Sequence, residues 1–350
     1  MDFTFGADED LLRETARDHL TRAPKDGEGH ARPAWEQLVA GGWTDPTLTP
    51  VQLAILADEA GYALLTQPWL ITVGSAGPAF QAAGRDLDRP ATLVGVGARQ
   101  DIRSKARGSR ISGFADTVPY PGPDAILVVK AFDEDDVPSL VVVSDPVGLA
   151  IECPSSLVDP TCPAINVTFD ETPTEPLVDP ATTATVLAQA RRRTVVLQTC
   201  EAIGVSRRAL RLATDYARSR TQFGRQIGSF QAVSHRLADV YATVELATAL
   251  AYRAAWSLDQ SVVDSALPEP VLSAWLGARA AAIQATQAAI QTFGATGFLW
   301  DHPVAALHRR ACWLQSCAPS AHQLRADLAA HLLDEPSPGV DVRASFSGGW

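Results

Sequence analysis

Residues 181–219 form a 39-residue run that contains no proline and a single glycine, Gly204. Such a run predicts one very long helix. Apolar residues at helical spacing predict three more, over residues 230–257, 268–293 and 304–333. Because amphipathic helices of this length need a partner along the whole of their apolar face, residues 181–335 are expected to form a four-helix bundle.

The two zones before the bundle differ from it and from each other. Residues 1–88 keep helical spacing, and Thr49 followed by Pro50 is typical of an N-cap and a first helical position. Residues 89–180 carry short β-branched segments that predict an antiparallel sheet or small barrel. These segments are residues 92–96, 125–129, 139–143 and 164–169. We therefore expect a mainly helical α+β fold with a helical domain, a middle β domain, the bundle, and an extended or disordered tail over residues 336–350.

Charge and cysteine usage exclude several classes of protein. A net charge of -11 argues against nucleic-acid binding, although the arginine cluster at residues 218–225 can serve a phosphate-bearing ligand. The five cysteines form no CxxC pair, so neither a disulfide framework nor a metal site is expected. This cysteine usage predicts a reducing, cytoplasmic compartment. The N-terminus does not resemble a signal peptide, and charged residues interrupt the apolar helices, so no contact with a membrane is expected.

Residues 216–231 carry the most chemical information. They end one predicted helix, turn through glycines and start the next. Arg220 at the helix end and Gln222 in the turn place donors at a corner between helices, where a guanidinium can hold a diphosphate through two parallel hydrogen bonds. The alternative is a purely structural corner, in which Arg220 complements the helix dipole while Phe223 and Phe230 pack in the core.

A second informative stretch, residues 291–298, lies about 70 residues after Arg220. Small residues at a helix end let a backbone approach a ligand closely, although glycine also commonly terminates helices. The glutamine and small residues of this stretch are Gln291, Gly294, Ala295 and Gly297. A Trp-Asp-His-Pro sequence at residues 300–303 and the pair Arg309-Arg310 follow it.

Together these stretches resemble the motifs of the acyl-CoA dehydrogenase family. The family's Arg-x-x-Phe-Gly, with a Gln eleven residues after the Arg, is matched by Arg220, Phe223, Gly224 and Gln231. Residues 291–298 resemble its Gln-x-x-Gly-Gly-x-Gly-Phe, with Ala295 in place of the second Gly. Residues 300–310 look like the actinobacterial branch, and the resemblance covers essentially the whole chain.

The resemblance implies an FAD-dependent enzyme that desaturates an acyl-CoA thioester between its α and β carbons. In the family a Glu removes the α-proton and the flavin takes the β-hydride, while the corner motif contacts the ADP and diphosphate of FAD across a subunit interface. The cofactor-binding residues implied here are Arg220, Gln222, Phe223, Gln231, Gln291, Gly294, Ala295 and Gly297. An electron-transfer flavoprotein is the implied electron acceptor.

The sequence departs from the family where its reaction takes place. Counting from the motifs, the two positions that supply the base fall on Ala318 and Thr194, and neither side chain can act as one. The flavin-contacting segments of the β domain are absent, with residues 94–99 and 117–119 in their places. These losses resemble the non-catalytic, β-type subunit of actinobacterial α2β2 heterotetramers, many of which act on steroid side-chain CoA esters. A catalytic partner subunit would then supply the base and the flavin-ring pocket.

Two alternatives stay open. The chain would be a self-sufficient enzyme if a relocated base replaced the missing Glu, and the candidates are Glu201 and Asp301, although a helical Glu is commonly salt-bridged and the Asp301-His302 pair can simply cap a helix. It would be a scaffold of the same fold if it bound neither FAD nor acyl-CoA. The retained motifs disfavour the scaffold, and the missing base disfavours the self-sufficient enzyme.

Overall fold

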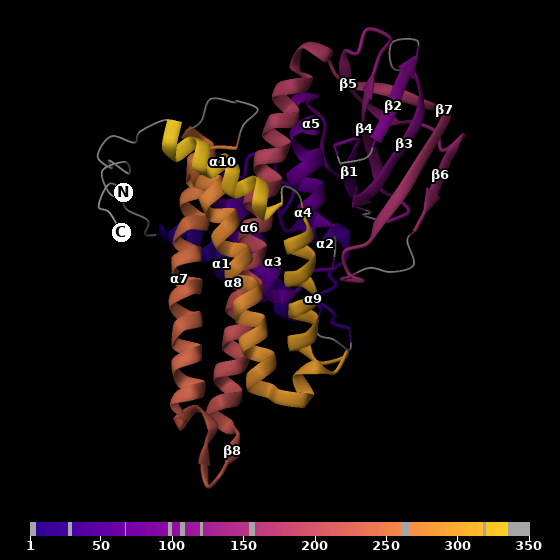
Figure 1. Ribbon diagram of the computed structural model, residues 1–350. Coiled ribbons are helices and arrows are strands. Elements are labelled where there is room, and N and C mark those ends of the chain that lie inside the picture. The colour runs from indigo at the N-terminus through magenta and orange to yellow at the C-terminus, as the bar shows by residue number, and fades with distance from the viewer. Residues whose placement is uncertain are drawn as a thin grey trace.

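The computed structural model describes residues 5–26, 30–66, 68–96, 100–105, 109–119, 122–153, 158–260, 267–317 and 320–334. The expected tail at residues 336–350 and the base position Ala318 lie outside these residues. The expected fold class is confirmed: a bundle of long helices runs the length of the molecule, shorter N-terminal helices pack along it, and a β domain lies beside one end (Figure 1). None of the helices in the described part of the chain could cross a membrane.

The four-helix bundle consists of α6 (Pro180–Ser219), α7 (Gln231–Gln260), α8 (Glu269–Phe293) and α9 (Pro303–Ser316). Helix α8 packs against α6, α7 and α9, and its buried face is built largely of alanine, which lets the helix axes approach closely. The single last helix predicted over residues 304–333 is wrong. Helix α9 ends at Ser316, Cys317 has an extended ψ of 138°, and a separate helix, α10 (Ala321–Asp334), follows. Pro319 explains the break, because proline has no N–H to continue the helix.

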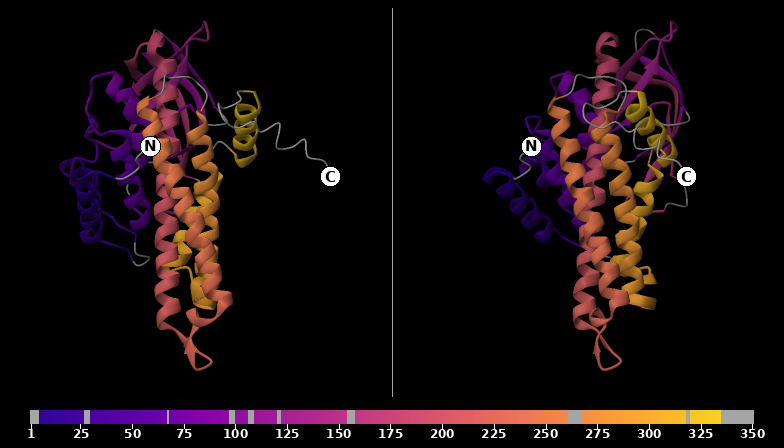
Figure 2. Two further views of the ribbon diagram at one scale, coloured as in Figure 1. Left: turned by 90° about the vertical axis from the view of Figure 1, so that its left-hand side faces the viewer. Right: turned by 60° about the vertical axis from the view of Figure 1, so that its left-hand side comes forward.

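The N-terminal helices cover one side of the bundle and carry most of their contacts on α6 (Figure 2). In chain order they are α1 (Ala7–Arg22), α2 (Trp35–Ala40), α3 (Pro50–Ala63), α4 (Trp69–Ile71), the π-helical η1 (Thr72–Ala76) and α5 (Gly77–Ala82). The predicted N-cap is confirmed, since the Thr49 hydroxyl accepts a hydrogen bond from the Gln52 amide at 3.2 Å. Helices α3 and α6 meet backbone to backbone at Gly61 and Gly204.

The β domain closes into a small barrel. Its strands are β1 (Ala91–Val94), β2 (Gln100–Lys105), β3 (Arg110–Pro119), β4 (Ile126–Phe132), β5 (Pro138–Val143), β6 (Leu149–Glu152) and β7 (Ala164–Val178). Hydrogen-bonded neighbours run β4–β2–β3–β7–β5 and return to β4, which closes the ring. Most pairs are antiparallel, as predicted, but β1 and β2 both pair with β4 in parallel. Alternate residues of β7 point into the barrel, where Ile165, Val167 and Phe169 are buried.

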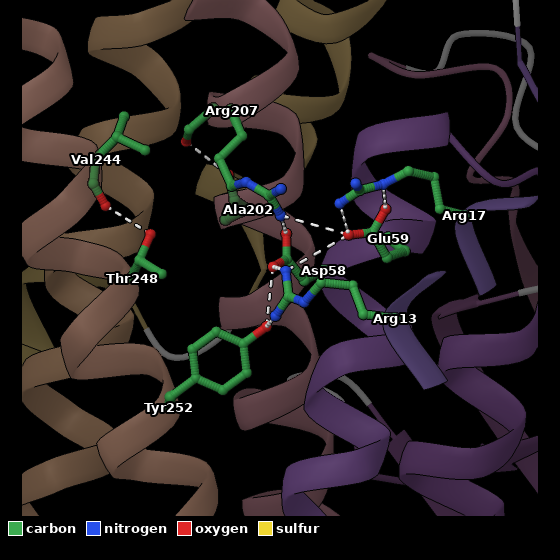
Figure 3. Close-up of polar contacts among 10 residues, drawn as sticks. Arg13, Arg17, Asp58, Glu59, Ala202, Arg207, Val244, Thr248 and Tyr252 are labelled. Carbon is green, nitrogen blue, oxygen red and sulfur yellow. Dashed lines mark hydrogen bonds and ion pairs between the residues drawn. The ribbon is translucent and has the colours of Figure 1, made fainter. Parts of the chain in front are cut away.

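A buried group of charged residues joins α1, α3, α6 and α7 (Figure 3). Asp58 of α3 is 1% exposed and accepts hydrogen bonds from Arg13 at 3.0 Å, Tyr252 at 2.9 Å and Arg207 at 2.6 Å. Burial acts to lower the pKa of Arg207, but the facing Asp58 carboxylate outweighs it and the pKa is raised. Asp58 thus holds the N-terminal helices against the bundle.

Glu59 makes the second half of this charged group. Its two carboxylate oxygens accept hydrogen bonds from Arg17 at 2.8 and 3.1 Å, an arrangement in which one guanidinium meets both oxygens. Arg13 and Arg17 both belong to α1, so these contacts anchor that helix to α3.

Candidate functional site

The corner predicted from residues 216–231 is a hairpin that extends beyond the end of the bundle (Figures 1 and 2). It pairs β8 (Thr221–Gln222) with β9 (Arg225–Gln226). The two residues between the strands, Phe223 and Gly224, have φ angles of 52° and 78°. Positive φ at both central residues defines a type I′ turn, whose twist suits a two-residue hairpin and favours glycine. The turn is therefore built to project from the helices.

The side chains of this hairpin point to solvent. Phe223 is 93% exposed. The structural alternative, which predicted that this ring packs in the core, is therefore wrong for Phe223. Its ring lies edge-on to the half-buried Phe230 at 6.2 Å. The Arg220 backbone is held by Tyr216 at 2.8 Å, but its exposed guanidinium makes no hydrogen bond or ion pair with any residue that the structure describes. Gln222, like Gln231 beyond it, is exposed.

The second motif forms a tight turn after α8. Gly294 ends the helix with a φ of 68° and opens the 3-10 segment η4 (Gly294–Phe298). A Cβ added to Gly294 would meet no atom within 4 Å, so the space beside this backbone is open. A Cβ on Gly297 would instead stand 3.1 Å from the Ile290 backbone, so a side chain at this position would crowd the turn. Gln291 and Ala295 are exposed.

Aromatic stacking holds the two motifs at the same end of the bundle. Tyr216, near the end of α6, stacks on Phe293, the last residue of α8, with ring centroids 4.3 Å apart. Phe293 also meets the ring of His302 edge-on at 4.7 Å. The three helix ends of α6, α8 and α9 thus form one corner, and all eight predicted FAD contacts lie on or beside it. Their binding of FAD stays a prediction.

The residues after the second motif add an exposed aromatic surface to this corner. Phe298 and Trp300 are 76% and 62% exposed, and the Arg309 guanidinium lies 4.0 Å from the Trp300 ring centroid. The candidate base Asp301 is exposed next to them. His302 caps α9 by accepting a hydrogen bond at Nδ1 from the Val304 amide, and burial lowers the pKa of its imidazole. His302 therefore has a structural role as the N-cap of α9.

A second candidate site is a cavity of about 440 Å³ where the barrel meets the bundle. Its walls are mostly apolar, and its polar groups include Thr161, Cys162, Glu201 and Arg310. The other candidate base, Glu201, thus lies in a cavity rather than on a solvated helix face.

Arg310 is the buried cation that pairs with the carboxylates at this cavity. The guanidinium is 1% exposed and donates from Nε to Asp159 at 2.7 Å, from Nη1 to Glu201, and from Nη2 to the Thr161 hydroxyl at 2.7 Å and the Leu65 carbonyl at 3.4 Å. Its contacts join α9 to α6, to the loop before β7 and to the segment after α3. Arg310 therefore connects all three parts of the fold at one point.

The pKa values of the two carboxylates around Arg310 are shifted in opposite directions. One guanidinium faces two acids, so full ionisation would leave an excess negative charge in a buried place. Burial opposes ionisation of Asp159, but Arg310 and the hydroxyl and amide of Thr161 outweigh it and lower its pKa. Burial raises the pKa of Glu201, because Arg310 is its one hydrogen-bond partner among the described residues and does not compensate fully. Glu201 is therefore the more readily protonated of the two acids.

The base positions counted from the family motifs hold no carboxylate. Thr194 lies in α6 against η1, with its hydroxyl 3.2 Å from where a Cβ on Gly74 would stand. This buried hydroxyl oxygen has no hydrogen-bond partner among the described residues. The residue after Cys317, the other position, falls outside the described part of the chain.

The sequence reasoning missed the network of Arg310 and Asp159. The sequence does contain a signal for the pair of Arg310 and Glu201. Arg310 continues the apolar stripe of Leu307 and Leu314 on α9, and Glu201 falls on the buried face of α6, so each helix carries one charge where an apolar residue is expected. Two opposite charges on buried helix faces indicate a pair. Asp159 lies in a loop, and no periodicity could have identified it.

Several solved structures, acyl-CoA dehydrogenases among them, share the fold of this chain. The ChsE4-ChsE5 complex of Mycobacterium tuberculosis matches 96% of this chain and 100% of its own with a TM-score of 0.79 at 21% identity. Butyryl-CoA dehydrogenase of Megasphaera elsdenii matches 95% and 100% with a TM-score of 0.80 at 18% identity. A variant of a steroid acyl-CoA dehydrogenase, Tcur3481-Tcur3483, matches 95% and 99% with a TM-score of 0.78 at 23% identity.

Sequence comparison supports the same class. Residues 186–332 match the family model of the acyl-CoA dehydrogenase C-terminal domain. Acyl-CoA dehydrogenase FadE27 of Mycobacterium tuberculosis is 30% identical over 279 residues, which cover 76% of this chain and 71% of that protein. Acyl-CoA dehydrogenase IpdE2 of the same organism is 29% identical over 291 residues, which cover 81% and 78%. The chain belongs to the acyl-CoA dehydrogenase family.

Proposed function

We propose that this chain is the non-catalytic subunit of a heteromeric, FAD-dependent acyl-CoA dehydrogenase. In this proposal its end-of-bundle corner binds the ADP and diphosphate of an FAD whose ring lies in a partner subunit. The observation that carries it is the exposed Arg220 guanidinium, which has no partner among the described residues. It lies next to the exposed Phe223 on a hairpin that projects past the bundle.

The corner fits half of such a cofactor. A guanidinium without an internal partner can donate two parallel hydrogen bonds to a diphosphate. The open space beside Gly294 lets an incoming group approach that backbone, and the exposed amides of Gln222, Gln231 and Gln291 can donate to ribose or adenine. A ligand bound on a surface that projects this far needs a second wall. We assign that wall to the partner subunit.

The cavity supports the non-catalytic half of the proposal. A base must be a carboxylate that is free to accept a proton from the substrate. Glu201 is instead in contact with Arg310, which is itself held by Asp159. A base in this position would have to separate from its buried cation, at a cost of several kcal/mol. Glu201 is therefore disfavoured as a relocated base. Asp301 is disfavoured because its side chain is exposed, whereas the base needs a buried carboxylate with a raised pKa.

The flavin, when bound, supplies the hydride acceptor, and the partner subunit supplies the base that removes the α-proton. This chain's residues hold and orient the cofactor from its diphosphate end. We propose an acyl-CoA thioester as substrate, with a steroid side-chain ester as the specific class, an α2β2 assembly, and an electron-transfer flavoprotein as electron acceptor. Two observations support the steroid class: one structure of the same fold is a steroid acyl-CoA dehydrogenase, and the motifs resemble those of the actinobacterial branch.

The test is co-expression of this chain with a base-carrying acyl-CoA dehydrogenase, followed by flavin absorbance of the purified complex. We expect a yellow complex with turnover, and a nearly colourless, inactive single chain. Arg220→Gln should lower the flavin content of the complex by at least about tenfold at equal assembly, as expected for one lost charged contact of about 1.5–3 kcal/mol. Arg211→Gln is the control, because Arg211 is an exposed arginine of α6, the helix that Arg220 follows, and pairs with Asp215.

Other outcomes identify the alternatives. A single chain that purifies with flavin and turns over substrate would support a relocated base, and Glu201→Gln would then abolish turnover. A colourless pool with every candidate partner would support a scaffold. Equal flavin retention by Arg220→Gln and the wild-type complex would contradict the role given to the corner.

A further inference from the structure

A second hollow lies in the N-terminal domain, apart from both regions described above. It has a volume of about 400 Å³ and is formed by α2, α3, η1, α5 and the segment after α5, with one side chain from α6. Its apolar walls include Leu53, Val73 and Phe80, which are buried. The α6 side chain is that of Arg193. Ligand pockets are commonly of this size and have mostly apolar walls with a few polar groups that orient the ligand.

Arg193 differs in its surroundings from Arg207 and Arg310. Arg207 and Arg310 each meet carboxylates at hydrogen-bond distance. Arg193 is half-buried, and no described residue forms an ion pair or hydrogen bond with it. Burial accordingly lowers the pKa of its guanidinium, with no acid to offset the effect. Its charge has lost part of its hydration without a protein replacement, so an anion placed against it would be stabilised.

The backbone around Arg193 leaves room for that anion. Nη1 of Arg193 lies 3.5 Å from where a Cβ on Gly77 would stand, and Leu87 approaches the same point at 3.6 Å. The glycine therefore keeps this side of the guanidinium uncovered, with an apolar side chain next to it. A carboxylate could meet the planar guanidinium while its apolar part lies on Phe80 and Val73.

The rim of the hollow limits which anions fit. Asp45, Asp86 and Asp88 line the opening and are exposed, with Arg85 as the one basic residue among the rim groups that the structure describes. Three carboxylates near the entrance repel a ligand with several negative charges, such as the phosphates of CoA. A ligand with one negative charge at its inner end and an apolar body is repelled much less.

We propose that this hollow is a binding site for a small monocarboxylate with an apolar body, held by Arg193. The site lies in the N-terminal domain, and its occupant is a free acid rather than a thioester. The proposal does not depend on the assignment of the end-of-bundle corner.

The test is calorimetric titration of the full-length chain with hexanoate and with cyclohexanecarboxylate, each compared with its neutral primary amide. We expect saturable binding of the carboxylates and at least about tenfold weaker binding of the amides, because a hydrogen-bonded charge contributes about 1.5–3 kcal/mol. Arg193→Gln should weaken carboxylate binding by the same factor and leave amide binding unchanged. Arg191→Gln is the matched control, since Arg191 is an exposed arginine two residues away that does not line the hollow.

A second variant tests the same charge without removing Arg193. Gly77→Asp introduces a carboxylate next to Nη1, and its Cβ meets only ordinary contacts of 3.5 Å or more. It should abolish carboxylate binding and raise the unfolding temperature, because the guanidinium gains an internal partner. No binding by the wild-type chain, equal binding of acid and amide, or unchanged binding by either variant would overturn the proposal.

Discussion

Arg310 in the last helix of the bundle donates a hydrogen bond from Nε to Asp159 in the loop before β7, at 2.7 Å, and both side chains are no more than 2% exposed. The same guanidinium holds Glu201 of α6. The net contribution of such a buried ion pair to stability is small, but the loss of one partner is costly. Two carboxylates would remain buried without a cation.

We predict that Arg310→Met lowers the free energy of unfolding by about 3–5 kcal/mol, because Asp159 and Glu201 then lose their buried partner. Urea denaturation followed by circular dichroism measures the change. Arg309→Met is the neighbouring control, and we expect a loss of about 1 kcal/mol or less, since Arg309 packs against the exposed Trp300. Adding Glu201→Leu and Asp159→Asn to Arg310→Met should restore much of the stability. A triple variant no better than the single one would contradict this account.

The raised pKa of Glu201 predicts a pH-dependent term in stability. The folded chain binds this proton more tightly than the unfolded chain, so stability is lost as pH rises from about 4.3 through the folded pKa. Glu201→Gln removes that loss. Its free energy of unfolding should rise relative to wild type across this window, by about 1.4 kcal/mol for each unit that separates the two pKa values. Urea titrations at intervals between pH 4 and 8 measure the difference, and a constant difference would show that burial does not govern this acid.

Tyr252→Phe tests the charged group between α1, α3 and α7. The Tyr252 hydroxyl donates to Asp58 at 2.9 Å and accepts from Arg13 at 2.6 Å. Its removal leaves both charges short of a partner and should cost about 1.5–3 kcal/mol. Thermal and urea unfolding measure it. Tyr241→Phe is the matched control on the same helix, because Tyr241 is 57% exposed, and its effect should stay within about 0.5 kcal/mol. Equal effects of the two variants would argue against the network.

Local pattern was sufficient to predict the first three long helices of the bundle and the turn at its end. The glycine-poor run at residues 181–219 became α6, and the turn glycines of the motif became a projecting hairpin, because both depend on neighbours in the chain. The last helix was predicted too long because its apolar spacing continues across Pro319. Spacing describes the face of a helix but does not mark a break in its backbone.

The long-range relationships could not be predicted. The parallel pairing of β1 with β4 depends on the closure of the barrel and leaves no local pattern. The partners of Arg310 are 109 and 151 residues away in the chain. A charge on an apolar helix face indicates that a partner exists, but which side chain meets it depends on how three parts of the fold pack together.

Gly204→Ala tests the crossing of α3 and α6. A Cβ on Gly204 would stand 2.0 Å from the carbonyl oxygen of Asp58 and 2.5 Å from the amide nitrogen of Tyr62, so the two helices would have to separate. We expect a loss of at least about 1–3 kcal/mol, as for other overpacked sites. Gly277→Ala is the matched control in α8, where a Cβ would meet its nearest atom, in Leu250, at 3.5 Å. Alanine is the better helix former, so this variant should gain about 0.5–1 kcal/mol. Opposite signs in the two urea titrations would tie stability to the backbone contact at Gly204, whereas a gain in both would mean that α3 and α6 do not pack as closely as their glycines allow.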